Sequence, residues 1–187
     1  MPLKTPICDF GQAAKSFELK STDNKIIKLN DIKGENGTLV MFICNHCPYV
    51  IAVIKSIVED CKNLEKLGIK AVAICSNDSI NYPEDSFNKM ITFHSNHNFN
   101  FPYLLDETQV VAKNYGAVCT PDFFGYNKNL ELQYRGRIRE LKNLKPIISG
   151  ESDLFKAMKQ IAETGKGPRE QIPSLGCSIK WLENECT

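Results

Sequence analysis

The sequence predicts an α/β protein in which helices flank a central mixed β-sheet. Residues 38–43 form a continuous apolar run, typical of a buried strand, and apolar side chains then recur at helical spacing from Val50 to Leu67. Gly68 ends that pattern, and residues 69–74 form a second apolar run. Because a strand, a helix and a strand follow one another directly, we expect two parallel strands joined by a helical crossover.

The elements on either side of this unit are shorter. Residues 16–29 predict a small N-terminal β-hairpin that extends the domain. A second helix is expected to begin near Pro83, since proline suits the first helical turn. A third helix is expected after Asp106, because Asp106 and Gln109 have the spacing of a capping box.

The C-terminal third predicts a hairpin and a final helix. Residues 123–126 and 130–134 are two strand-like segments separated by a short polar turn. Ser152 has the position of an N-cap for the last helix. We therefore assign residues 1–165 to one domain and residues 166–187, which Pro and Gly interrupt, to an extended tail packed on or near it.

Composition excludes some classes of partner. The 187 residues hold 23 Lys and Arg against 22 Asp and Glu, a formal charge of +1, so we expect neither nucleic acid nor a membrane as partner. No segment has signal-peptide character or the roughly 20 apolar residues that a membrane helix needs. We therefore expect a cytoplasmic protein, in which most of the eight cysteines are reduced.

The segment Cys44-Asn45-His46-Cys47-Pro48 joins the first predicted strand to the first predicted helix. A thiolate attacks a disulfide, so a redox cysteine must lose its proton near neutral pH. Helix N-termini stabilise such an anion through free N–H groups and the helix dipole. We expect Cys44 to be the exposed attacking sulfur, Cys47 the shielded resolving sulfur, and His46 a neighbour that makes the pair more oxidising.

Two further features bear on this CxxC pair. Thr120-Pro121 stands directly before a predicted strand, a position in which we favour a cis peptide bond. Half of a zinc site is the alternative for the pair, but it would need a second close pair of ligands. Cys61 and Cys75 are isolated and are expected in the core.

With these motifs the chain resembles the thioredoxin-like redoxin-domain proteins of the alkyl hydroperoxide reductase/thiol-specific antioxidant (AhpC/TSA) superfamily, in a bacterial subgroup with a CNHCP motif. The resemblance extends over nearly the whole chain, and its motifs are specific in combination. They are residues 41–50 around the CxxC, 76–78, 82–86, 101–104, 115–124, 134–138 and 176–181. It implies a thioredoxin fold in which Pro121 is a cis-proline facing the dithiol and places Thr120, with Cys119, beside Cys44.

The chain departs from the peroxidase members of that superfamily. Their signature, Pro-x-x-x-Thr/Ser-x-x-Cys, has Val40 and Cys44 at its first two fixed positions when counted from Cys47. Counted from Cys44, those positions hold Gly37 and Met41. Neither register fits, which favours disulfide exchange over peroxide reduction.

A second departure concerns proton transfer. Thioredoxins carry a buried Asp six residues before the first cysteine, where this chain has Thr38. Asp78 and Glu84 are candidates to replace it, and a solvated loop or helix-start charge is the alternative interpretation of either acid. Arg135 and Arg137 are interpreted as surface salt-bridge partners.

We therefore predict a thiol–disulfide oxidoreductase that exchanges a Cys44–Cys47 dithiol with protein or small-molecule disulfides, uses no cofactor, and is served by a reducing system of unknown identity. A thiol peroxidase using Cys44 is one alternative. A metal-binding or metallochaperone module using Cys44, Cys47 and a histidine is another. Cys177 has two interpretations, an extra resolving thiol or an unpaired thiol in a tail that docks through Ile179 and Trp181.

Overall fold

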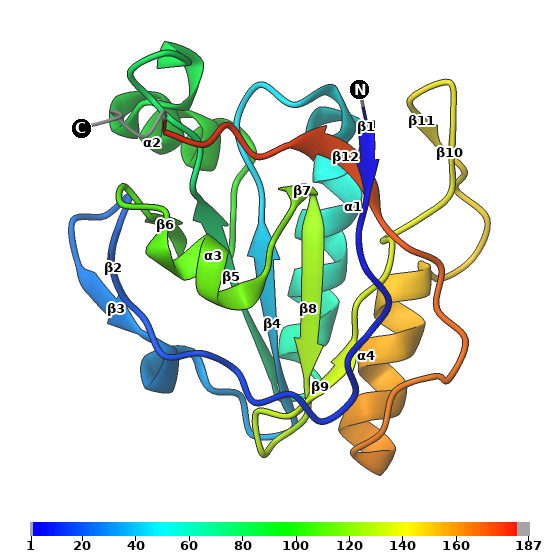
Figure 1. Cartoon of the computed structure of the whole chain (residues 1–187). Helices are drawn as coiled ribbons and strands as arrows, with labels where there is room; N and C mark the ends of the chain where they lie inside the picture. Colours follow the sequence, from blue (N-terminus) through cyan, green and yellow to red (C-terminus); the bar gives the residue numbers. More distant parts are fainter. Residues whose placement is uncertain (1, 183–187) are drawn as a thin grey trace.

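The computed structural model describes residues 2–182, and its central feature is a seven-stranded mixed sheet in the order β3-β2-β6-β5-β4-β8-β9 (Figure 1). These strands are β2 (Glu18–Ser21), β3 (Ile26–Lys28), β4 (Gly37–Phe42), β5 (Ile69–Cys75), β6 (Tyr103–Leu105), β8 (Asp122–Tyr126) and β9 (Leu132–Tyr134). β5 runs parallel to β4 and β6, whereas the remaining pairs are antiparallel. The predicted mixed sheet and parallel crossover are confirmed.

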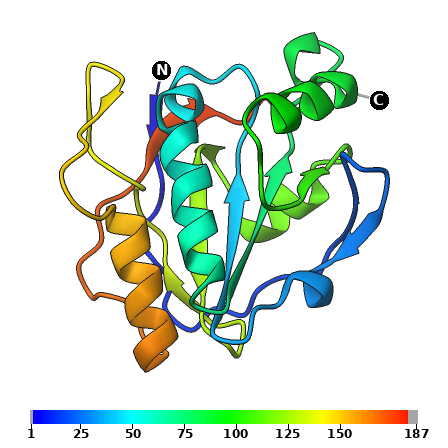
Figure 2. The ribbon, with the colours of Figure 1, turned by 180° about the vertical axis from the view of Figure 1, so that it is seen from behind.

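Helices cover both faces of this sheet (Figures 1 and 2). α1 (Pro48–Glu65), α2 (Phe87–Asn96) and α4 (Asp153–Thr164) pack on one face, and α3 (Val110–Tyr115) packs on the other. Successive side chains of a strand point to opposite faces. In β4, accordingly, Leu39 and Met41 enter the first core, and Val40 and Phe42 enter the second.

A smaller sheet lies at the end of the main sheet where α1 begins (Figure 1). It consists of β1 (Pro2–Lys4), β12 (Leu175–Ser178) and β7 (Cys119–Thr120), with β12 in the centre and both pairings antiparallel. A short β10 (Leu141–Lys142) and β11 (Lys145–Pro146) form a separate hairpin. Part of the predicted tail is therefore a sheet strand, while residues 183–187 lie outside the described chain. Within residues 2–182, no helix is long and apolar enough to cross a membrane.

Several boundaries differ from the sequence predictions. The N-terminal hairpin exists, but it belongs to the main sheet because β2 pairs with β6. The second helix begins at Phe87, and Pro83 instead begins a separate 3-10 turn, η2 (Pro83–Asp85). A further 3-10 turn, η1 (Leu29–Ile32), follows β3. Ser152 caps α4 as predicted, since its side chain accepts a hydrogen bond from the Phe155 N–H.

The predicted capping box at the third helix is wrong. α3 begins at Val110, and Gln109 has a left-handed backbone with φ 61°. The Asp106 carboxylate accepts from the N–H groups of Val111 and Ala112. The Gln109 amide instead donates to carbonyl oxygens of Ser76 and Lys180, so long-range contacts with the C-terminal segment replace the local box.

Candidate active site

The dithiol lies in the connection from β4 to α1. β4 ends at Phe42, and α1 begins at Pro48, whose missing N–H costs nothing at the first helical position. Cys47 is the N-cap residue. The residue at the helix N-terminus is therefore Cys47, whereas the sequence predicts Cys44, and the Cys47 side chain makes no capping hydrogen bond.

Both sulfurs are buried. Cys44 is 1% exposed and Cys47 is 0% exposed, so the prediction of an exposed Cys44 is wrong. Thr120 contacts both residues: its hydroxyl lies 3.4 Å from the Cys44 Sγ, and its carbonyl oxygen lies 3.0 Å from the Cys47 Sγ, from which it accepts when Cys47 is protonated. The Thr120–Pro121 peptide bond is cis. Strand β7 thus places Thr120 against the dithiol.

The two neighbouring thiols shift each other's pKa in opposite directions. The Cys44 thiol lowers the pKa of Cys47 to about 5. Cys47, then burial and the charge of Asp85, raise the pKa of Cys44 well above its ordinary value. At neutral pH the pair therefore holds one proton and one negative charge.

His46 faces a buried carboxylate. Its Nδ1 lies 2.7 Å from Oδ2 of Asp85, whose side chain is fully buried. The imidazole also stacks on Tyr82, with ring centroids 5.9 Å apart. Asp85 is held by the Asn45 N–H and the Asn77 side-chain amide, each at 2.7 Å. A positive charge on His46 would therefore be paired with Asp85 as well as placed beside Cys44.

Asp85 is the site residue that the sequence analysis missed. Neither proposed acid takes its place: Asp78 accepts from Ile80 and Asn81, and Glu84 reaches the site through its carbonyl oxygen. The motif at residues 82–86 contains Asp85, but nothing in its spacing distinguishes this carboxylate from Glu84. The 3-10 turn η2 distinguishes the two acids, because it directs the Asp85 side chain into the protein interior.

Two further thiols lie near the pair. Cys119 is fully buried in β7, and its Sγ is 3.7 Å from the Pro121 carbonyl oxygen. Cys177 is directly opposite Thr120 in the β7–β12 pairing, and Thr120 in turn contacts Cys47. Cys61 and Cys75 are buried core residues, as predicted, and burial raises the pKa of both thiols.

Arg135 supports the loop that carries Pro121. Its guanidinium is buried, with Nη2 2.9 Å from Oδ2 of Asp122, and it also donates to the Gly116 carbonyl oxygen. The interpretation of Arg135 as a surface partner is wrong. Arg137 is closer to that expectation, since it is half-buried and pairs with Asp153 at 2.8 Å.

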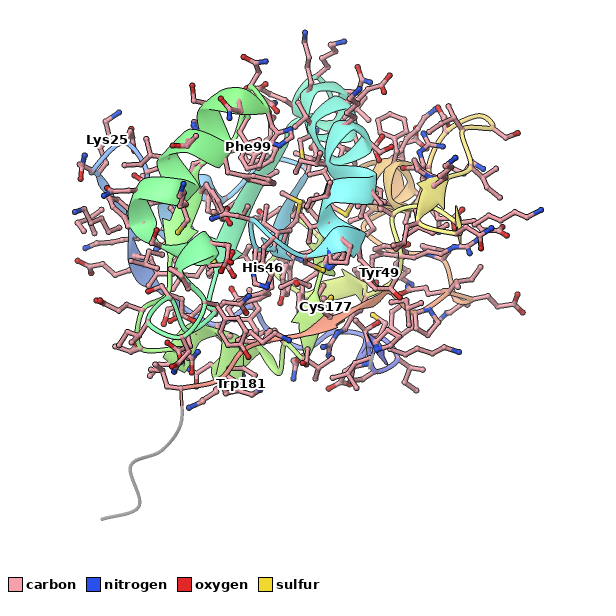
Figure 3. All side chains as sticks on the ribbon, turned by 90° about the horizontal axis from the view of Figure 1, so that it is seen from above. Lys25, His46, Tyr49, Phe99, Cys177 and Trp181 are labelled. Atoms are coloured by element: carbon pink, nitrogen blue, oxygen red, sulfur yellow. The ribbon has the colours of Figure 1, made fainter. Side chains whose placement is uncertain are left out.

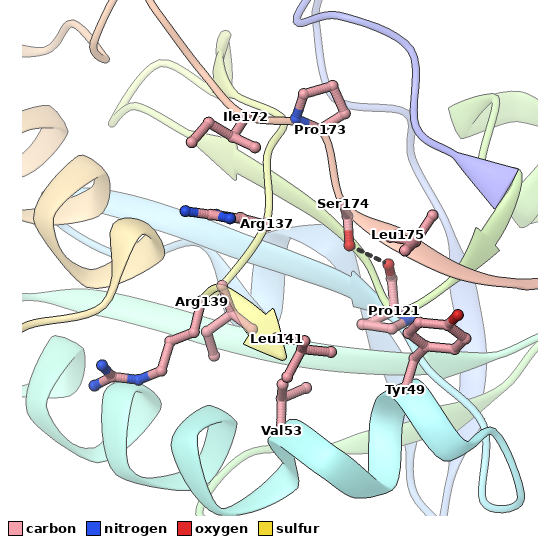
Figure 4. A pocket seen from close by; sticks show the side chains of 11 residues that line it. Tyr49, Val53, Pro121, Arg137, Arg139, Leu141, Ile172, Pro173, Ser174 and Leu175 are labelled. Carbon is pink, nitrogen blue, oxygen red and sulfur yellow. Dashed lines mark hydrogen bonds between the residues drawn. The ribbon is translucent and has the colours of Figure 1, made fainter. Parts of the chain in front are cut away.

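A pocket of about 130 Å³ adjoins Pro121 (Figure 4). Tyr49 and Val53 of α1 form one wall, and Leu175 lies opposite (Figure 4). Ser174 closes the end by donating to the Pro121 carbonyl oxygen at 2.8 Å. Arg137 and Arg139 line the same pocket, together with Ile138, Leu141, Ile172 and Pro173.

The Cys44 sulfur, the His46 ring and the Asp85 carboxylate also form a compact group. One potential ligand atom from each lies within 4.8 Å of the others. Thiolate, imidazole and carboxylate are all zinc ligands.

Comparison with known proteins identifies one matching family model and several similar solved structures. Residues 10–141 match the family model described as the AhpC/TSA family. An uncharacterized conserved protein from Geobacillus kaustophilus is 38% identical, with 98% of each chain covered and a TM-score of 0.92. A hypothetical protein from Sinorhizobium meliloti 1021 is 32% identical over 97% of this chain and 98% of its own, with a TM-score of 0.88.

Functionally described neighbours are more distant. A secreted disulfide oxidoreductase from Mycobacterium tuberculosis is 18% identical over 63% of this chain and 80% of its own, with a TM-score of 0.54. This likeness shows a shared thioredoxin-like fold. The curated proteins include no match to the chain.

Proposed function

Since the chain belongs to the AhpC/TSA family, we propose that it is a thiol–disulfide oxidoreductase whose Cys44–Cys47 dithiol reduces protein or small-molecule disulfides. One observation carries the proposal. The two thiols lie in one buried cluster at the N-terminus of α1, and Thr120 contacts both. A pair with one stabilised thiolate and one neighbouring thiol has the groups that disulfide exchange needs.

Cys47 acts first as a base. As the Cys44 sulfur attacks one sulfur of the substrate disulfide, its proton passes to the neighbouring Cys47 thiolate. The other substrate sulfur leaves as a thiolate. The protonated Cys47 then donates to the Thr120 carbonyl oxygen, 3.0 Å away.

Cys47 next resolves the mixed disulfide. Its sulfur attacks Cys44, the Cys44–Cys47 disulfide forms, and the second substrate sulfur departs with the proton. The substrate thus gains two electrons and one proton from the pair, and the first substrate thiolate takes its proton from water. A reducing system of unknown identity returns the pair to the dithiol.

The pocket beside Pro121 supports a polypeptide substrate. It combines an apolar wall from Tyr49 and Val53 with the cationic side chains of Arg137 and Arg139. We expect this pocket to bind the side chain of a residue adjacent to the substrate cysteine, and to prefer an apolar or an acidic side chain.

An insulin-type disulfide reduction assay tests the proposal. We expect wild-type protein to catalyse the reduction and Cys44→Ser to abolish it. Cys8→Ser is the matched control, because Cys8 is half-buried and packs in the core on the opposite face of the sheet. Full activity in Cys44→Ser would overturn the proposal.

A metal-binding role is a second candidate, favoured by the close approach of Cys44, His46 and Asp85. It predicts near-stoichiometric zinc in anaerobically purified wild-type protein and its loss in His46→Ala. Elemental analysis that finds no bound metal would remove this candidate.

A further inference from the structure

Cys177 lies over the dithiol, although it is 130 residues after Cys47 in the sequence. Figure 3 looks down on this end of the molecule and shows Cys177 between His46 and Tyr49. Strand β12 fixes the position, since Cys177 pairs with Thr120 on one side and Pro2 on the other. Its side chain packs against the core cluster that contains Cys44 and Cys47.

The three thiols differ in their solvent exposure. Cys44 and Cys47 are at most 1% exposed, whereas Cys177 is partly exposed. An external thiol must reach a disulfide sulfur to reduce it, and the greater exposure of Cys177 favours that approach. We propose that Cys177 is a third redox thiol, which attacks Cys47 in the buried disulfide and presents the resulting Cys47–Cys177 disulfide to a reducing thiol. This inference rests on the proposed function.

The transfer needs no additional oxidant. The Cys177 sulfur bonds to Cys47, the Cys44–Cys47 bond breaks, and the Cys177 proton ends on Cys44, so the protein's oxidation state is unchanged. A reducing thiol then attacks the Cys177 sulfur and expels the Cys47 thiolate. A second reducing thiol releases Cys177, and the two thiols leave as their own disulfide with two electrons given to the protein.

The pKa of Cys47 favours the second step, in which the reducing thiol expels Cys47. A thiol of low pKa leaves a disulfide faster, and the neighbouring Cys44 lowers the pKa of Cys47 to about 5. The pKa of Cys177 is raised to about 11 by burial and then by its contacts with Cys47. The contribution from the Cys47 charge disappears once Cys47 is in a disulfide, so Cys177 becomes easier to deprotonate at the step where it must attack.

Peptide mapping of the oxidised Cys44→Ser variant tests whether Cys47 and Cys177 are close enough to form a disulfide. Trypsin places Cys47 in the peptide of residues 34–55 and Cys177 in the peptide of residues 170–180. We expect mild oxidation with diamide to join these two peptides by a disulfide. Free Cys47 and Cys177 after that oxidation, or Cys47 joined only to a second molecule, would overturn the proposal.

The rate of reduction tests the role. We expect glutathione to reduce the oxidised Cys177→Ser protein more slowly than wild type by about tenfold. Cys8→Ser is the matched control, because Cys8 is also partly exposed and its pKa is likewise raised to about 11 by burial. An unchanged rate in Cys177→Ser would overturn the relay.

These measurements distinguish an error in the Cys177 relay from an error in the proposed oxidoreductase function. If wild type forms a Cys44–Cys47 disulfide and reduces insulin, but Cys177→Ser is reduced as fast as wild type, the relay alone is wrong. If wild type forms no Cys44–Cys47 disulfide, both are wrong.

Discussion

The buried ion pair between Arg135 and Asp122 gives a quantitative prediction about the loop that holds Pro121. The Arg135 Nε is 3.3 Å from Asp122 Oδ1, and its Nη2 is 2.9 Å from Oδ2 and 2.7 Å from the Gly116 carbonyl oxygen. The guanidinium also lies over Phe124, 4.4 Å from the ring centroid. Asp122 is 0% exposed. Arg135→Met therefore leaves a fully buried carboxylate without its counterion.

Removing one partner of a buried pair costs about 3–5 kcal/mol of unfolding free energy, since an uncompensated charge stays inside. Burial already raises the pKa of Asp122, and Arg135 opposes that rise. In Arg135→Met we expect Asp122 to take up a proton on folding. The double variant Arg135→Met/Asp122→Asn should lose about 1–3 kcal/mol less than the sum of the two single losses.

Urea unfolding at pH 7 measures these free energies. Arg169→Met is the matched control, because Arg169 is exposed and lies over Phe10 at 5.5 Å, with no ion pair to any residue between 2 and 182. We expect that variant to lose less than about 1 kcal/mol. A similarly small loss in Arg135→Met, or simple additivity in the double variant, would refute the reasoning.

Two carboxylates give further predictions. Burial raises the pKa of Asp60 from 3.8 to about 6, so the folded state keeps a proton that the unfolded chain releases, and this group's contribution to stability falls as pH rises through that interval. Asp60→Asn should raise the unfolding free energy by about 3 kcal/mol at pH 7 and leave it nearly unchanged at pH 4; urea unfolding that finds an equal gain at both pH values would contradict this. The charge of Asp85 contributes to the raised pKa of Cys44. Asp85→Asn in a Cys47→Ser background should therefore speed iodoacetamide alkylation of Cys44 severalfold at pH 7, and slower alkylation would count against it.

Local patterns predicted the part of the fold that holds the dithiol. β4, α1 and β5 follow from two apolar runs, helical spacing and Gly68, which act within a few residues. The Ser152 cap is likewise a local hydrogen bond. These signals were sufficient to place Cys44 and Cys47 between a strand and a helix.

Contacts between distant segments could not be predicted in this way. β12 is four residues long and is stabilised by pairing with β1 and β7, so its own sequence carries little strand signal. The burial of Cys44, of Asp85 and of Arg135 depends on which segments cover them in three dimensions. Residue type alone favours the surface for Asp and Arg, and only a specific buried partner reverses that preference.

The central claim, that Cys44 and Cys47 form a reversible redox pair, is tested most directly by the mass of the tryptic peptide of residues 34–55. The protein is equilibrated in glutathione buffers of graded potential, quenched with acid and alkylated before digestion. We predict that this peptide gains an internal disulfide under oxidising conditions and returns to two alkylated thiols under reducing conditions. Two alkylated thiols at every potential would contradict the account.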